Sequence, residues 1–179
     1  TWKSKRKLAI NRKYKKFLLA KEKNIDDVRS AYSSIIDSLI ALKRNDEIIN
    51  VAFELLKETT PLAETAYKVG RYYLDKANYV LAAFWYRMAL DSRPYSDSIA
   101  VNDRDYYGWI PCIDLCVCYF KMNKFKCAYF FNELAASFDG PMEDIETNRN
   151  ILKENFKSLN IEAPKLEYPL KISDYVNYL

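Results

Sequence analysis

The strongest constraint on this chain is the stretch 63–96, in which small and large side chains recur at the offsets of a helix-turn-helix unit of about 34 residues. With Val69 just ahead of the glycine, the matching residues are Gly70, Tyr73, Ala82, Tyr86, Ala89 and Pro94. Small residues let two antiparallel helices approach closely, and aromatic rings fill the space that remains. The final proline stops the second helix. The stretch therefore predicts two packed helices that form one repeating unit.

The same pattern occurs on both sides of this stretch. A degenerate copy comes earlier, at a distance one residue short of a full unit, with Ile49, Phe53 and Leu56 as its buried stripe and Pro61 at its end. A later copy is offset by 46 residues, which is one unit of 34 plus an insertion of 12 at residues 97–108. The later copy has Leu115, Cys116, Tyr119, Ala128 and Ala135 in place of Val69, Gly70, Tyr73, Ala82 and Ala89. These units resemble tetratricopeptide repeats, which implies a right-handed superhelix of paired helices with one concave face.

The composition supports one all-α domain. Half of the 179 residues are hydrophobic, and 3 glycines with 6 prolines are too few for the frequent turns of a β-sandwich. No apolar run reaches the length of about 18 residues that predicts a membrane span. We expect about eight helices, arranged as a basic lead-in helix in 1–24, repeats over 25–139, a capping helix in 140–160 and an extended tail in 161–179, where Pro164 and Pro169 oppose helix.

Positive charge is concentrated at the start of the chain. Residues 1–24 contain ten Lys or Arg and a single acid, Glu22, although the net charge of the whole chain is only +4. Such an arm suits nucleic acid, anionic lipid or an acidic neighbouring domain. The arm also has apolar residues at helical spacing, such as Leu8, Phe17 and Leu18, and no module for nucleic-acid recognition follows it. We therefore favour a solvated helix that packs onto the first repeat.

A second resemblance is carried by several longer stretches. They are residues 105–111 (DYYGWIP), 115–119 (LCVCY), 128–135 with Asn132, 148–149, 72–74, 83–86, 89–90 and, among the basic residues, 5–7 and 11–12. These stretches are similar to the repeat region that follows the catalytic domain in bacterial family-two glycosyltransferases, over roughly residues 5–159 and most specifically over 67–149.

The resemblance implies a non-catalytic carboxy-terminal accessory domain. Because the first residue is Thr1 rather than Met, we expect the chain to be part of a longer protein. The domain would bind a protein or peptide segment, such as the glycosylation acceptor or its own catalytic domain, or it would form homo-oligomers. The alternative is a free-standing scaffold or adaptor protein that bridges partners. A third hypothesis is an adaptor that binds lipid or nucleic acid through the basic arm.

The motif Asp103-Arg104-Asp105 invites a metal and nucleotide-diphosphate site, because the family's catalytic domain uses an acidic motif of this kind. That motif needs a strand end beside a phosphate pocket, whereas here it lies in the insertion between repeats. We therefore expect surface acids, with Asp103 or Asp105 as a cap of the helix that begins near Trp109. The aromatic residues Tyr106, Tyr107 and Trp109 are expected to fill the gap between repeats rather than to remain exposed.

Four cysteines invite a zinc site. Cys112, Cys116 and Cys118 fall on one predicted helix and Cys127 on the next, but Cys118 points about 160° away from Cys116 on a helix. We expect small buried apolar cysteines, in a reducing and therefore cytoplasmic compartment. The chain has no histidine, which excludes imidazole acid–base chemistry. We expect no catalytic residue, no metal and no cofactor.

The repeat resemblance also implies which residues line the concave face. In the central unit they are Glu64, Tyr67, Arg71, Leu74 and Asp75, and in the last unit Ile110, Ile113, Val117, Phe120 and Lys121. We expect Ile113 and Val117 to belong to the core instead. A groove that mixes Arg71, Asp75 and Lys121 with aromatic rings suits a peptide or protein segment.

Overall fold

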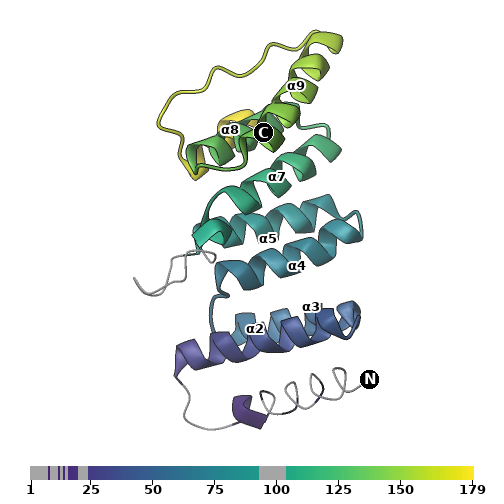
Figure 1. The fold of residues 1–179 in the computed structure, drawn as a ribbon, viewed down its shortest axis with the longest axis vertical. Helices are drawn as coiled ribbons and strands as arrows, with labels where there is room; N and C mark the ends of the chain where they lie inside the picture. The colour runs from purple at the N-terminus through teal and green to yellow at the C-terminus, as the bar shows by residue number, and fades with distance from the viewer. Residues whose placement is uncertain (1–7, 9–11, 13, 15, 20–23, 93–103) are drawn as a thin grey trace.

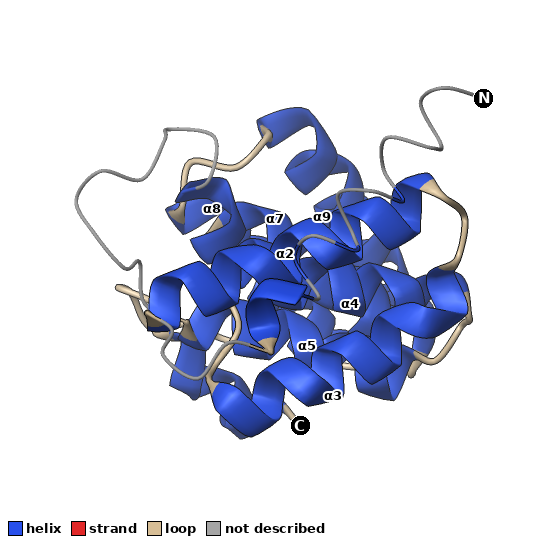
Figure 2. Cartoon of the chain, turned by 90° about the horizontal axis from the view of Figure 1, so that it is seen from below, coloured by secondary structure: helices blue, strands red, loops and turns tan. Residues whose placement is uncertain are grey.

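The structure, a computed structural model, describes residues 8, 12, 14, 16–19, 24–92 and 104–179. Within this part of the chain all regular structure is helical and no strand occurs (Figure 2). The α-helices are α2 (Ile25–Ala41), α3 (Ile48–Glu58), α4 (Ala63–Asp75), α5 (Tyr79–Asp91), α7 (Trp109–Lys121), α8 (Phe125–Ser137) and α9 (Met142–Ser158). Three 3-10 helices are η1 (Asn45–Glu47), η2 (Asp105–Tyr107) and η3 (Ile172–Tyr178). The predicted all-α class is confirmed.

Consecutive helices pack in pairs, and the pairs stack along the long axis of the molecule (Figure 1). α2 packs with α3, α4 with α5 and α7 with α8, and α9 then covers α8. The buried residues form two main clusters, a first among α2 to α5 and a larger second one that extends from α5 to α9. A small third cluster, of Val28, Tyr32 and Leu55, lies between α2 and α3. None of these described helices combines the length and the apolar character that crossing a bilayer requires.

The paired helices share one internal geometry. α7 and α8 begin and end 46 residues after α4 and α5, as the sequence offset predicts. In each turn one residue has a positive φ, namely Lys43 (59°), Ala77 (54°) and Asn123 (58°). The residue after it donates a backbone hydrogen bond of 2.9 Å in all three turns, from Arg44 to Leu39, Asn78 to Tyr73 and Lys124 to Tyr119. This is the Schellman-type ending of a helix, used three times at equivalent positions.

The buried stripe of α3 differs by one residue from the predicted stripe. Phe53 is 53% exposed and Leu56 36% exposed, whereas Ile48, Ala52 and Leu55 are buried. The buried residues stand one full repeat unit ahead of Ala82, Tyr86 and Ala89, so the first unit is not shortened. The left-handed turn at Lys43, which holds the position that Ala77 has in the next unit, sets this register. The predicted stripe was wrong at Phe53 and Leu56, whereas Ile49 is partly buried and packs against the first core cluster. Ile49 and Leu56 directly follow apolar residues that face the core, which made the two registers hard to tell apart.

The described part of the insertion, residues 104–108, packs between the second and third pairs through η2. Tyr106 and Tyr107 pack against the first core cluster and Trp109 against the second. The expectation that these aromatic residues fill the gap is confirmed. The predicted helix cap is not found at Asp105, because α7 begins after Gly108 and no side chain caps it. Residues 97–103, including Asp103, lie outside the described part of the chain.

The carboxy-terminal tail is not extended throughout, contrary to the prediction. After Pro164 and Pro169 the chain forms η3, a 3-10 helix that packs against α8. Tyr175 and Tyr178 of η3 are partly buried and pack against the second core cluster. The two prolines oppose a long α-helix ahead of η3, but they do not prevent a short helical segment after them.

Most of the basic arm lies outside the described residues. Among those described, Phe17 and Leu18 pack against Val28, Tyr32 and Leu55 of the first helix pair. The capping segment predicted at 140–160 contains α9, whose residues Ile145, Leu152 and Phe156 are buried, while Leu159 is 49% exposed.

Candidate functional site

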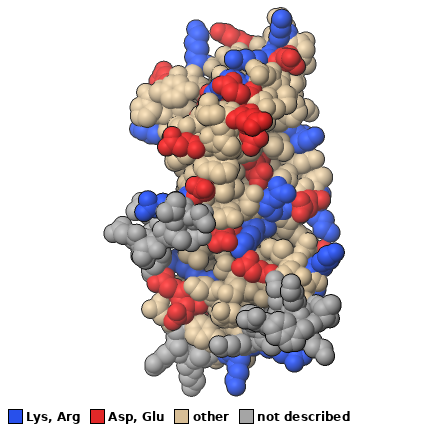
Figure 3. All heavy atoms as spheres, viewed as in Figure 1, with Lys and Arg blue, Asp and Glu red and all other residues tan. Residues whose placement is uncertain are grey.

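Three of the five predicted concave-face residues of α4, Glu64, Arg71 and Asp75, form ion pairs. Glu64 lies 2.7 Å from the ammonium of Lys68, which also contacts Asp37 of α2. Arg71 lies 3.5 Å from Asp114 of α7 and 3.6 Å from Asp75 one turn further along α4. Charged side chains thus connect α2 to α4 and α4 to α7. Both signs are also interspersed over the face seen in Figure 3.

Asp114 is central to this arrangement, and the sequence did not identify it. It lies 46 residues after Lys68, so the two occupy equivalent positions, and each pairs with a neighbouring helix. That equivalence was the signal that could have found it. The side chain is only 14% exposed, and its Oδ2 has no hydrogen-bond partner in the part of the chain that the structure describes.

Two tyrosines lie beside Asp114. The ring of Tyr67 is 5.4 Å from that of Tyr86 and 5.1 Å from that of Tyr106. Burial, with the nearby Asp114 carboxylate as the next cause, raises the pKa of Tyr67 and of Tyr86 far above 10. Both hydroxyls therefore stay protonated at neutral pH, so they can donate hydrogen bonds but cannot act as bases. We name Tyr67, Arg71 and Asp114 the α4–α7 seam.

Three of the five predicted residues of α7 line a pocket between α7 and α9, whereas Ile110 and Ile113 do not. Phe120, Lys121 and Val117 face Asn148 and Ile151 of α9 around a volume of about 180 Å³. Lys121 is exposed at its edge, and Phe120 packs edge-on against Phe125 at 5.3 Å. Leu74 of α4 instead packs against the core. The structure therefore separates the predicted site into the seam and this pocket, and the α9 contribution was not predicted.

The cysteines are buried thiols. Cys112, Cys116, Cys118 and Cys127 are each at most 3% exposed and unoxidised. Burial raises the pKa of Cys116 and Cys118 to about 12 and that of Cys127 to about 11, so these thiols carry no charge at neutral pH. A search of the described residues finds no group of three or more Cys, Asp or Glu side chains placed to hold a metal.

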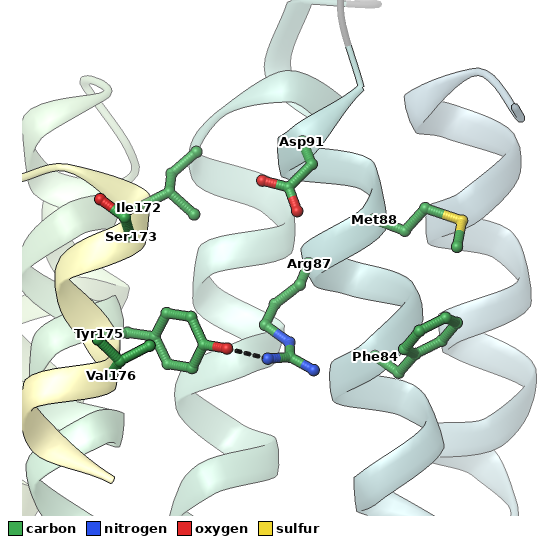
Figure 4. Close-up of a pocket in the computed structure, with 8 residues that line it drawn as sticks. All are labelled: Phe84, Arg87, Met88, Asp91, Ile172, Ser173, Tyr175 and Val176. Carbon is green, nitrogen blue, oxygen red and sulfur yellow. Dashed lines mark hydrogen bonds between the residues drawn. The ribbon is translucent and has the colours of Figure 1, made fainter.

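A second and larger groove lies between α5 and η3. It has a volume of about 530 Å³, and Phe84, Arg87, Met88 and Asp91 of α5 face Ile172 and Val176 of η3 across it (Figure 4). Arg87 reaches across to hydrogen-bond the hydroxyl of Tyr175, and its guanidinium lies 5.2 Å from the centre of that ring. Sequence reasoning missed this groove, because it depends on where the tail folds back.

Comparison of the chain with protein-family profiles, with curated proteins and with solved structures finds no match. Both resemblances drawn from the sequence, to tetratricopeptide repeats and to the repeat region of family-two glycosyltransferases, stay predictions.

Proposed function

We propose that this chain is a non-catalytic binding domain of the tetratricopeptide-repeat type, and that it serves as the carboxy-terminal accessory domain of a family-two glycosyltransferase. Its concave face would hold a polypeptide segment, such as the acceptor that the enzyme modifies. The proposal draws on the residue stretches similar to that family and on helix pairs that recur with equal bounds and equal turns.

The single observation that carries the binding role is the pocket between α7 and α9. Its volume of about 180 Å³ accommodates one or two side chains, while sites for small-molecule ligands are generally larger, about 300 to 1,000 Å³. Val117, Phe120 and Ile151 give it apolar walls, and Lys121 places a positive charge at its edge. This combination suits an apolar anchor followed by an acidic residue in a bound peptide.

The chemistry of the titratable residues also favours binding over catalysis. The thiols and the hydroxyls of Tyr67 and Tyr86 are protonated at neutral pH, so neither group supplies a nucleophile or a base there. The seam carboxylate Asp114 lies beside Arg71, an arrangement that ties two helices together. Incubation of the chain with nucleotide sugars should give no turnover, and turnover would contradict the proposal.

The pocket can be tested with peptides selected from a random library against the whole chain. We expect selected peptides to pair an apolar residue with a carboxylate, and Lys121→Glu should weaken their binding by about tenfold. Lys124→Glu is the matched control, since it makes the same charge change at an exposed residue just ahead of α8 that does not line the pocket. Equal binding by wild type and Lys121→Glu would exclude the pocket as the binding site.

The glycosyltransferase assignment has a separate test, which is the coding sequence ahead of Thr1. An upstream domain of about 200 residues with alternating strands and an acidic motif would support it. A coding sequence that starts at this position would favour the alternative of a free-standing scaffold protein.

A further inference from the structure

The outer faces of α5 and α8 occupy equivalent positions but differ in exposure. Leu81 and Phe84 of α5 lie 46 residues before Cys127 and Phe130 of α8. Cys127 and Phe130 are completely buried, whereas Leu81 is 38% and Phe84 44% exposed. Both faces are apolar, so the difference comes from what covers them.

The tail covers the face of α8. The thiol of Cys127 donates to the backbone carbonyl of Tyr175 at 3.7 Å. The ring of Tyr178 stacks on Phe130 with centres 5.4 Å apart, and the ring of Tyr175 lies 5.6 Å from Phe131. The chain itself therefore contains an example of what this kind of surface binds, namely one short helical segment with two tyrosines three residues apart.

The α5 face borders the groove described above, which is continuous with the η3–α8 interface. Phe84 and Met88 form one wall, and Ile172 and Val176 form the other (Figure 4). A volume of about 530 Å³ is enough for several side chains, so a short segment can lie beside η3 much as η3 lies on α8. The groove also extends the surface that η3 uses, because η3 presents one side to α8 and another to the groove.

The charged groups of the groove indicate which segment fits. Arg87 uses its Nη1 to bond Tyr175, but its Nε is buried and has no acceptor among the described residues. This nitrogen is shielded from a bound segment, but the guanidinium group of Arg87 also lines the groove, and a carboxylate is its best partner there. Asp91 also lines the groove, so an acidic side chain on the bound segment would pair with Arg87 on the side away from Asp91.

We propose that the groove between α5 and η3 is a docking site for a short helical segment of a partner protein, one that carries two aromatic residues three positions apart and an acidic residue. The site lies on the outer face and does not depend on the proposed glycosyltransferase role or on the pocket between α7 and α9.

The tail of this chain supplies the probe. A synthetic peptide of residues 170–179 contains Asp174, Tyr175 and Tyr178, and it can be titrated into the whole chain with methyl-labelled methionine. The chain has 3 methionines. Met88 lines the groove, whereas Met142 is the first residue of α9 and does not line it. We expect a saturable shift of the Met88 methyl signal and no shift at Met142. The covalently attached η3 should hold its place on α8, because its effective concentration is in the millimolar range or above.

Variants make the test specific. Phe84→Ala should lower the affinity of the chain for the peptide by about tenfold, the loss typical of truncating an aromatic residue at the centre of an interface. Phe53→Ala is the matched control, an exposed phenylalanine on α3 outside the groove. A peptide with both tyrosines replaced by alanine should not shift Met88.

Three results would overturn the proposal. One is a Met88 signal that stays unchanged at millimolar peptide. Another is equal affinity of the wild type and Phe84→Ala. The third is a Met88 shift that grows with protein concentration alone, together with a dimer in sedimentation, because a second copy of the chain would then be the occupant.

Discussion

At the scale of single residues, the contact between Gly70 and Tyr86 determines how closely α4 and α5 approach. A β-carbon built on Gly70 would lie 2.5 and 2.6 Å from two ring carbons of Tyr86. Tyr86 is completely buried, so its ring has no open space into which it can move. The glycine is therefore needed for space, and its backbone φ is not positive.

Gly70→Ala should consequently destabilise the chain. Glycine to alanine in a helix normally stabilises by about 1 kcal/mol, because alanine has the higher helix propensity. Here the overlap with the ring should reverse the sign and lower the free energy of unfolding by about 1 to 3 kcal/mol. Urea denaturation measures the change.

The control for this prediction is the same substitution in a Tyr86→Leu background. With the ring removed, Gly70→Ala should be neutral or stabilising. An equal loss in both backgrounds would show that the ring is not responsible.

In the third helix pair, different residues occupy the positions at which Gly70 and Tyr86 pack in the second pair. Cys116 and Asn132 occupy the positions equivalent to Gly70 and Tyr86. Asn132 is too small to fill a ring's space, and it instead donates from Nδ2 to the carbonyl of Ile145 at 3.0 Å, which ties α8 to α9. The sequence identified the match at Cys116 but not this bond, because the partner is a backbone group on the next helix.

At the scale of elements, α3 tests the corrected repeat register. Leu55 is 1% exposed and Leu56 is 36% exposed, although the two are chemically identical and adjacent. Leu55→Ala should lower the free energy of unfolding by about 2 to 5 kcal/mol. Leu56→Ala is its control and should change stability by less than about 1 kcal/mol. Similar losses from both variants, measured by thermal or urea unfolding, would contradict the register.

The elements also show where sequence reasoning succeeded and where it stopped. The bounds of the second and third pairs were predictable because Tyr73, Ala82 and Ala89 recur 46 residues later as Tyr119, Ala128 and Ala135. The left-handed turn at Asn123 has a recognisable residue, whereas Lys43 and Ala77 adopt the same φ with no such signal. In α3 neither the residue of the preceding turn, Lys43, nor the pattern of apolar residues marked the buried face clearly. The predicted register of this helix was therefore wrong by one residue.

The candidate site was predictable only in part for a related reason. Positions on α4 and α7 follow from the repeat spacing, so Arg71, Phe120 and Lys121 could be named in advance as candidates. Asn148 and Ile151 come from the capping helix, and η3 comes from the tail, neither of which repeats. Periodicity carries no information about segments that occur once.

At the scale of the whole molecule, the buried thiols make stability depend on alkaline pH. Burial raises the pKa of Cys116 and Cys118 from 9.0 to about 12. Between these values the unfolded chain loses thiol protons that the folded chain keeps, so stability is complete below about pH 9 and falls as pH rises. The expected slope is about 1.4 kcal/mol per pH unit for each thiol.

Urea denaturation between pH 8 and pH 11, with reductant present, checks this dependence. Cys118→Ala should reduce the slope of unfolding free energy against pH by the contribution of one thiol, about 1.4 kcal/mol per pH unit. A stability that stays constant over this range, or the same slope in the variant, would contradict the prediction.

Because the core is divided into separate clusters, we expect a substitution in one cluster to destabilise only the helices that pack on it. Replacing Tyr175 and Tyr178 together by alanine uncovers Phe130 and Cys127, so amide hydrogen exchange in α8 should speed up by about tenfold or more. Exchange in α2 should not change, because stacked repeats contact only their neighbours. Equal acceleration in α2 would mean that the stack unfolds as one unit.

The positions of α9 and η3 give the stack a direction. Both contact α8, so a further helix pair inserted after residue 139 would have to displace two segments at once. Lengthening the array at its carboxy-terminal end, by gene duplication or by design, would therefore disrupt both contacts. Extra helix pairs inserted ahead of α7 would leave the contacts of α9 and η3 with α8 intact.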